Sequence, residues 1–244
     1  MTAQINAELL KIRSTRTTIG FALAMIAIIL LFALLSGLLT KAPHLTTSQD
    51  QLGLLSFGSI AGVFSALAGI MLITSEYRYG TIRPTFIFSP RRSRVLGAKL
   101  AAGLLAGLAF GIAGEALGFG IGYAILEARG IPYAPGTGQT ALVLCGTVAA
   151  SALWGAIGVG LGAIVRNQVG AIIAILAWGF VVENLLQAFV PSVGRFAPGN
   201  AENGLSGLTG KHLLTPAAGA ATLIAWTAAL AAIGAALAAR RDVT

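Results

Sequence analysis

Six long apolar runs constrain the fold of this chain more than any other feature of its sequence. The first, residues 17–40, would form a helix about 36 Å long at 1.5 Å per residue, and the hydrocarbon core of a bilayer is about 30 Å thick. The other five runs are residues 54–74, 98–126, 141–165, 169–190 and 217–239. Of the 244 residues, 56% are hydrophobic and only 10% are charged, which is typical of a multi-pass membrane protein. The sequence therefore predicts an all-α membrane protein, a single domain over residues 1–244 with six transmembrane helices.

The stretch between the second and third runs concentrates the basic charge. Residues 75–99 hold six of the sixteen Lys and Arg residues. Burying an ion in hydrocarbon costs on the order of 2.5–3.5 kcal/mol even on the mildest scale, so this stretch should lie in water. Gly80 and Thr81 would end one helix and cap a short one over residues 82–88, and Ser89 followed by proline is typical of the next helix start. We expect a short helix held between two spans.

The N-terminal residues 1–16 carry apolar side chains at helical spacing, Ile5, Leu9 and Ile12, with charged residues mostly on the other faces. This pattern predicts an amphipathic helix that lies in the membrane interface. The apolar run that follows is longer than the roughly 7–15 residues of a signal-peptide core, so a cleaved signal peptide is not expected.

The distribution of Lys and Arg predicts the orientation in the membrane. The side that holds both termini and the central basic stretch has twelve of them, whereas the other side has only Lys41, Arg129, Arg195 and Lys211. Because cytoplasmic loops carry the excess of positive charge, both termini are expected in the cytoplasm. The net charge of +8 follows from the same bias, and the long spans between basic residues argue against a nucleic-acid surface. Abundant Ala and Gly, with Arg preferred to Lys, favour the plasma membrane of a GC-rich bacterium.

Glycines and polar residues indicate how the spans pack and connect. Glycines recur about every four residues through the third run and would clear one helix face for close packing. They are Gly103, Gly107, Gly111, Gly114, Gly118 and Gly122. Residues 191–216 are rich in glycine and carry few charges, so we expect them to dip partly into the membrane. The polar residues 41–53 predict a loop.

Two carboxylates fall inside the predicted spans. Glu115 lies in the third span and Glu183 lies towards the outer end of the fifth. Intramembrane carboxylates usually face a cavity, which would place both of them, with Trp178, on a substrate path or at a site of proton coupling. The alternative is a protonated or hydrogen-bonded glutamate that joins helices, with the tryptophans packing or facing lipid. The sequence leaves both interpretations open.

No constellation of residues predicts catalysis. The phosphate-binding pattern G-x-x-x-x-G-K-[ST] is absent, and the similar stretch that ends at Lys211 has His212 where Ser or Thr is required. His44 and His212 have no metal-ligand or nucleophile pattern around them, and the single Cys145 lies in an apolar run. We therefore expect a non-catalytic chain that binds no metal and no cofactor itself.

The order of motifs along the chain resembles a known family. Residues 76–83, Glu-Tyr-Arg-Tyr-Gly-Thr-Ile-Arg, are followed by Ser-Pro-Arg at 89–91 and by Lys99. This order is similar to the Glu-x-x-x-Gly-Thr signature and basic helix start of type-2 ATP-binding-cassette (ABC) transporter permeases of the drug and antibiotic exporter group. The resemblance extends to residues 7–11 (the elbow helix of that family), 195–198 (its external segment after the fifth span) and 239–243 (its usual ending).

The resemblance implies a membrane-spanning subunit that pairs as a homodimer and binds a separate cytoplasmic ABC ATPase, which would hold the ATP and Mg. The ATPase would dock on the elbow helix and on the short coupling helix of the central stretch. Coupling to it would fall to Glu76, Gly80, Thr81, Arg83, Pro84, Arg91 and Arg94. Glu76 would pair with a nearby Arg such as Arg83 or with a basic residue of the elbow helix.

The expected function is the ATP-driven export of an amphiphilic or hydrophobic substrate, as in antibiotic resistance. Two other classes of function remain open. One is an ion-coupled secondary carrier or channel, in which the intramembrane glutamates would be the coupling sites, although no inverted repeat is visible in the sequence. The other is a membrane assembly or anchoring protein without transport.

Overall fold

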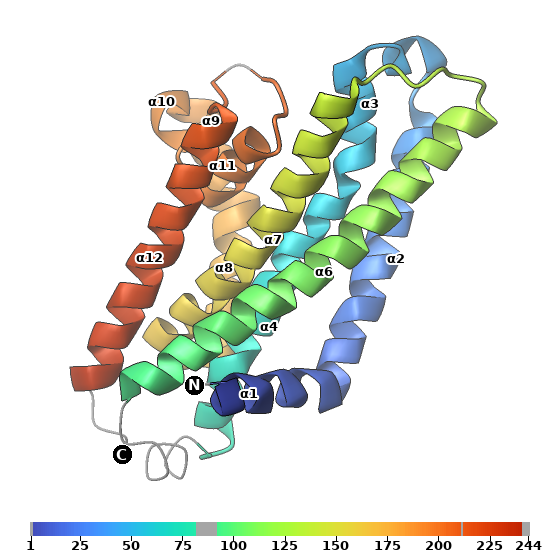
Figure 1. Cartoon of the computed structure of the whole chain (residues 1–244). Coiled ribbons are helices and arrows are strands. Elements are labelled where there is room, and N and C mark those ends of the chain that lie inside the picture. Colours follow the sequence, from blue (N-terminus) through green and yellow to red (C-terminus); the bar gives the residue numbers. More distant parts are fainter. Residues whose placement is uncertain (1, 82–91, 211, 241–244) are drawn as a thin grey trace.

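The computed structural model describes residues 2–81, 92–210 and 212–240. In these ranges every regular element is a helix. Among these described residues, six helices are long and apolar enough to cross a membrane. They pack as one bundle (Figure 1). The predicted all-α class and the six apolar spans are confirmed at this level.

The spans lie close to the predicted runs. The first, third and fourth are α2 (Arg16–Leu39), α6 (Arg92–Ala128) and α7 (Thr137–Val165). The second is the continuous helical stretch Ser48–Arg78, whose longest part is α4 (Ile60–Arg78). The fifth is made of α8 (Gln168–Ala177), a π-helical turn η3 (Trp178–Val182) and α9 (Glu183–Phe189), and the sixth is α12 (Pro216–Arg240).

The N-terminal segment is helical, as predicted. Helix α1 (Thr2–Ser14) lies across one end of the bundle, which we call the α1 end (Figure 1). Its Leu9 and Ile12 pack on an apolar cluster that includes Ile73 of α4 and Val159 of α7. The helix is therefore docked on the bundle through its apolar face. Its position in the membrane interface stays a prediction.

The segment predicted as a loop, residues 41–53, is largely helical. Two short 3-10 turns, η1 (Ala42–Leu45) and η2 (Ser56–Ser59), flank α3 (Ser48–Leu55), which continues through η2 into α4. The prediction of a loop was wrong for the second half of this segment. Its polar residues favour turns when taken singly, but here they begin a helix.

Two polar side chains explain why this segment is ordered. Thr47 caps α3, because its hydroxyl accepts the N–H of Asp50 at 3.2 Å. Gln51 is fully buried and donates to the carbonyls of Leu45 at 2.9 Å and Pro132 at 3.0 Å. The helix start thus also fixes the connection between α6 and α7.

Helix α6 is the longest element and confirms the close packing predicted from its glycines. Its 37 residues span about 55 Å, and it crosses the bundle obliquely (Figure 1). A Cβ atom at Gly107 would collide with the carbonyl of Ser151 in α7. One at Gly118 would lie 2.5 Å from the backbone nitrogen of Gly58 in η2. The glycine stripe therefore serves two partners, α7 in one half of the helix and the η2 turn in the other.

The segment between the fifth and sixth spans folds back onto the bundle. It forms α10 (Pro191–Gly194) and α11 (Pro198–Leu205). Ala201 of α11 is fully buried in a cluster with Trp154 of α7 and Leu223 of α12. Trp226 of α12 donates its indole N–H to the carbonyl of Phe196 at 2.8 Å. The segment is packed against the spans rather than standing free. Its predicted dip into the membrane stays a prediction.

The spans differ widely in how much of their surface the chain itself covers. In the most apolar part of each span, 72% of residues are buried in the second span and 61% in α7, but only 22% in α2 and 11% in each of the fifth and sixth spans. The second span and α7 thus form the centre of the bundle. Helix α6 is close to them, with 56% buried, whereas α2 and the fifth and sixth spans present broad apolar faces outward.

Candidate functional site

Lys99 of α6 stands at the centre of a charged cluster at the α1 end. Its ammonium lies 3.0 Å from Glu8 Oε2 of α1 and 2.8 Å from Glu76 Oε1 of α4. It also donates to the carbonyl of Leu72 at 2.9 Å. Only 1% of the residue is exposed. A lysine that the sequence placed in an aqueous stretch is therefore buried, and two carboxylates compensate its charge.

Lys11 of α1 completes this cluster into a ring. Its ammonium lies 3.0 Å from Glu8 Oε1 and 2.7 Å from Glu76 Oε1. Burial by itself lowers the pKa of Lys11, but the hydrogen bond that Lys11 donates to Glu76 and the charges of Glu8 and Glu76 outweigh it, so the pKa is raised. Two lysines and two glutamates thus alternate in a charge ring of zero net charge (Glu8, Lys11, Glu76 and Lys99).

The charge ring joins three elements that the sequence separates widely. Removal of one partner from a buried ion pair typically costs about 3–5 kcal/mol, because an uncompensated charge is left behind. The geometry of α1, α4 and α6 is therefore fixed at this end. Of the two partners expected for Glu76, the basic residue of α1 is found as Lys11.

The other predicted coupling residues lie just after α4, in the first turns of α6 or beyond the described ranges. Gly80, with φ of 69°, follows the end of α4 in the left-handed region that favours glycine. Thr81 and Arg94 are exposed. Arg83, Pro84 and Arg91, with the predicted coupling helix at 82–88, lie outside the described residues.

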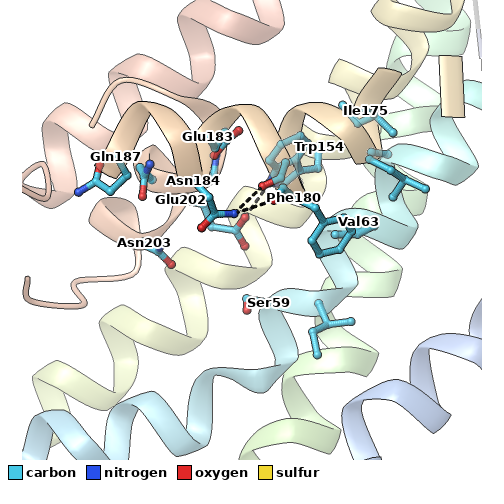
Figure 2. A pocket seen from close by; sticks show the side chains of 16 residues that line it. Ser59, Val63, Trp154, Ile175, Phe180, Glu183, Asn184, Gln187, Glu202 and Asn203 are labelled. Atoms are coloured by element: carbon cyan, nitrogen blue, oxygen red, sulfur yellow. Dashed lines mark hydrogen bonds between the residues drawn. The ribbon is translucent and has the colours of Figure 1, made fainter. Parts of the chain in front are cut away.

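A cavity of about 330 Å³ is lined in part by α9 and α11, which lie at the end of the bundle opposite α1 (Figure 1). It lies between α4, α7, the fifth span and α11 (Figure 2). One part of its wall is apolar and includes Ile60, Val63 and Ile175. The rest of the wall carries acidic and amide side chains, which are Glu183, Asn184, Gln187, Asn200, Glu202 and Asn203.

Glu202 of α11 is a buried carboxylate on this wall. Its Oε2 accepts the indole N–H of Trp154 at 2.7 Å, while its Oε1 has no hydrogen-bond partner among the described residues. Burial raises the pKa of Glu202 to about 8; the hydrogen bond from Trp154 opposes this shift and the charge of Glu183 adds to it. Unlike the lysines at the α1 end, this group has no counter-charge within reach in the described chain.

Glu183 is the first residue of α9 and follows the π-helical turn directly. Its Oε2 accepts the N–H of Gly199 at 2.9 Å, and its Oε1 has no partner in the part of the chain that is described. The amide of Asn184 donates to the carbonyl of Phe180 at 3.1 Å, which helps to satisfy the widened turn. A π-helical turn rotates the residues that follow it, and such turns are frequent at functional sites. Here it brings Glu183 over the cavity.

The two remaining residues of the predicted substrate path lie away from the cavity wall. Glu115 of α6 is 2% exposed, packs against Gly58 of η2, and neither carboxylate oxygen has a partner within the described ranges. Trp178 contacts Trp226 edge to face, with ring centroids 5.8 Å apart. Of the predicted path, only Glu183 lies on the cavity. A role for the other two in a path stays a prediction.

Sequence reasoning missed Glu202 and the burial of Glu8 and Lys99. A lone carboxylate in a glycine-rich segment with few charges was a usable signal for Glu202. Glu8 and Lys11, three residues apart on one helix, could have indicated a shared face. No cluster of three His, Cys, Asp or Glu side chains that could hold a metal ion occurs among the described residues.

No protein-family model matches this chain, and a search of curated proteins found no match either.

Proposed function

We propose that this chain is the membrane-spanning subunit of an ATP-driven exporter. It would move an amphiphilic or hydrophobic substrate outward across the plasma membrane of a bacterium, with both termini in the cytoplasm. A separate cytoplasmic ABC ATPase would bind ATP and Mg and supply the energy. The chain itself would carry no catalytic centre.

The charge ring is the observation that carries this proposal. A permease that receives mechanical work from an ATPase needs a stiff connection between its docking surface and its spans. The ring joins α1, α4 and α6 to one another through three contacts of 2.7–3.0 Å, and a fourth contact, between Lys11 and Glu8, lies within α1. It lies at the end of the bundle where the resemblance puts the docked ATPase. Displacement of α1 would therefore be transmitted to α4 and α6.

The apolar outer faces support pairing with a second copy. In the most apolar part of the fifth and sixth spans only 11% of residues are buried, and in α2 only 22%. Lipid can cover such faces, but a homodimer would also bury part of them and enclose a path between the two copies.

An ion-coupled carrier is the second candidate, and the carboxylates at the cavity favour it. Glu183 and Glu202 are both buried and each has one oxygen without a partner among the described residues. Such groups can exchange protons or cations during transport. In that case transport would depend on an ion gradient and not on ATP.

Purification of the tagged chain from the cells that make it, followed by transport in inverted vesicles, separates these functions. We expect an ATP-hydrolysing protein with a phosphate-binding loop to co-purify, and accumulation to require Mg-ATP and survive collapse of the proton gradient. The matched variant is Glu76→Ala, which should leave the permease in the membrane but lower transport. Transport that follows the ion gradient without ATP would establish the carrier instead.

A further inference from the structure

The charged side chains that line the cavity in the described chain are all acidic. Glu183 and Glu202 line it, whereas none of its sixteen described lining residues is Lys, Arg or His. The two side chains come from different elements, α9 and α11, and approach the same space (Figure 2). Above about pH 8, where Glu202 is ionised, the cavity therefore favours positive charge.

Both carboxylates have an oxygen that is buried and unused. Glu183 is 5% exposed and Glu202 is 8% exposed, and Oε1 of each accepts no hydrogen bond within the described chain. The other oxygen of each is already held, by Gly199 N–H and by Trp154 Nε1–H respectively. These contacts fix both carboxylates in place, so each presents one unsatisfied acceptor. A cation between them would be attracted by both carboxylates more strongly than a neutral group, through N–H bonds in a protonated amine and through charge alone in a quaternary ammonium.

The rest of the wall suits an organic body rather than a hydrated inorganic ion. Ile60, Val63 and Ile175 are apolar, and the rings of Trp154 and Phe180 also lie on the wall. Aromatic faces attract cations within about 6 Å of the ring centre. A volume of about 330 Å³ is that of a small ligand pocket.

We propose that this cavity binds an organic cation, an amine or quaternary ammonium with an apolar body, through Glu183 and Glu202. That such a cation is also the exported substrate rests on the proposed function. The binding itself does not, and it can be measured on the permease alone.

Two probes of equal shape and opposite charge test the proposal. Benzyltrimethylammonium and phenylmethanesulfonate each carry a tetrahedral head on a benzyl group, and benzyl methyl sulfone is the neutral third member. The full chain is placed in phosphatidylcholine nanodiscs above pH 8, where Glu202 is ionised. Binding is followed by isothermal titration calorimetry on the unaltered chain, with empty nanodiscs as the blank. We expect saturable binding of the cation, at least about tenfold tighter than that of the other two probes.

Matched variants assign the binding to the two carboxylates. Glu183→Gln and Glu202→Gln each keep the side-chain shape and should weaken cation binding about tenfold. Asn203→Asp adds a carboxylate to the wall and should tighten it. Glu127→Gln removes an exposed carboxylate at the end of α6, outside the cavity, and should have no effect. Size-exclusion profiles verify that each variant is folded, and the Asn203→Asp result stands even if Glu202→Gln does not fold.

Equal affinity for cation and sulfonate, or cation binding that the glutamine variants leave unchanged, would overturn the proposal. Displacement of the cation by sodium ions at equal concentration would do the same, since it would make the site one for inorganic ions. If the cation binds as expected while no ATPase co-purifies, the site stands and the exporter function fails. If ATP-driven export is found without cation binding, the exporter function stands and the cation site fails.

Discussion

The two ends of the bundle bury ionisable side chains in opposite ways. At the α1 end two lysines and two glutamates alternate within 2.7–3.0 Å, so every charge has a neighbour of opposite sign. Around the cavity, Glu183 and Glu202 are held by neutral donors, Gly199 N–H and Trp154 Nε1–H. Substitutions in the first arrangement are costly, because loss of one member leaves a buried charge without its counter-charge. The second leaves acceptors unused, which is the condition for binding something from outside the chain.

The proposed roles of the two ends require the α1 end to face the cytoplasm. Cysteine labelling tests this orientation with an all-or-none result. In a Cys145→Ser background, single cysteines are placed at Ser93, at the start of α6, and at Thr209, after α11; both positions are exposed. In intact cells an impermeant thiol reagent should label the Thr209 position only, since the basic end is expected inside. Mass spectrometry of the purified chain measures the labelling. Labelling at Ser93 from outside would reverse the orientation and remove the basis for ATPase docking at this end.

Removal of the buried lysine should produce the largest loss of stability. Lys99→Met keeps the length of the side chain but leaves Glu8 and Glu76 with Lys11 alone, and we expect a cost of about 3–5 kcal/mol in the free energy of unfolding. Denaturant titration in detergent, followed by circular dichroism, measures it. The double variant Glu8→Gln/Lys99→Met returns the ring to zero net charge, with Glu76 still paired to Lys11 at 2.7 Å, and should recover most of the loss. A single variant as stable as the wild type would show that the ring does not hold the α1 end together.

The carboxylates of the cavity should respond less to loss of charge than to loss of a donor. Trp154→Phe removes the indole N–H and leaves Glu202 Oε2 buried without it, so we expect a loss of about 1–3 kcal/mol. Glu202→Gln retains an acceptor for that N–H and removes a buried charge, so its stability should stay close to that of the wild type. The same unfolding measurement applies to both. Strong destabilisation by Glu202→Gln would mean that its charge is compensated after all, as at the α1 end.

The smallest effect should come from the exposed member of the ring. The side chain of Lys11 is 50% exposed, against 1% for Lys99, although both contact the same two glutamates. Ion pairs accessible to water contribute about 0–1 kcal/mol, so Lys11→Met should cost no more than that. Comparison of Lys11→Met with Lys99→Met under identical conditions isolates the effect of burial. Equal losses would indicate that the ring acts as one unit without regard to solvent.

Much of the fold could be predicted because the membrane restricts the alternatives. Each apolar run had to be a helix, and residues 17–40 and 169–190 are helical to within a residue or two of those limits. The start of the second span was missed by six residues, since the window of apolar residues begins at Leu54 while the helix begins at Ser48. Capping by Thr47 and burial of Gln51 depend on partners that a local pattern does not contain.

The candidate sites were harder to predict from the sequence, because their contacts join residues that lie far apart along the chain. Lys99 was grouped with solvent-exposed arginines, because the sequence does not contain the distance to Glu8, which lies 91 residues away. Glu202 lies 48 residues from Trp154, and no spacing rule connects them. Glu183 was recognised because a carboxylate within an apolar run is rare on its own. Sequence patterns thus identified isolated charges in spans, whereas compensated charges required the fold.

The order of the ring along the chain has a consequence for biogenesis. Glu8 and Glu76 both precede Lys99, and synthesis proceeds from the N-terminus. When the third span leaves the ribosome, the two carboxylates that neutralise its lysine have already been made. Lys99 can therefore pair with Glu8 and Glu76 as soon as the third span reaches the membrane. The reverse order would hold an unpaired lysine at the bilayer until later helices arrived.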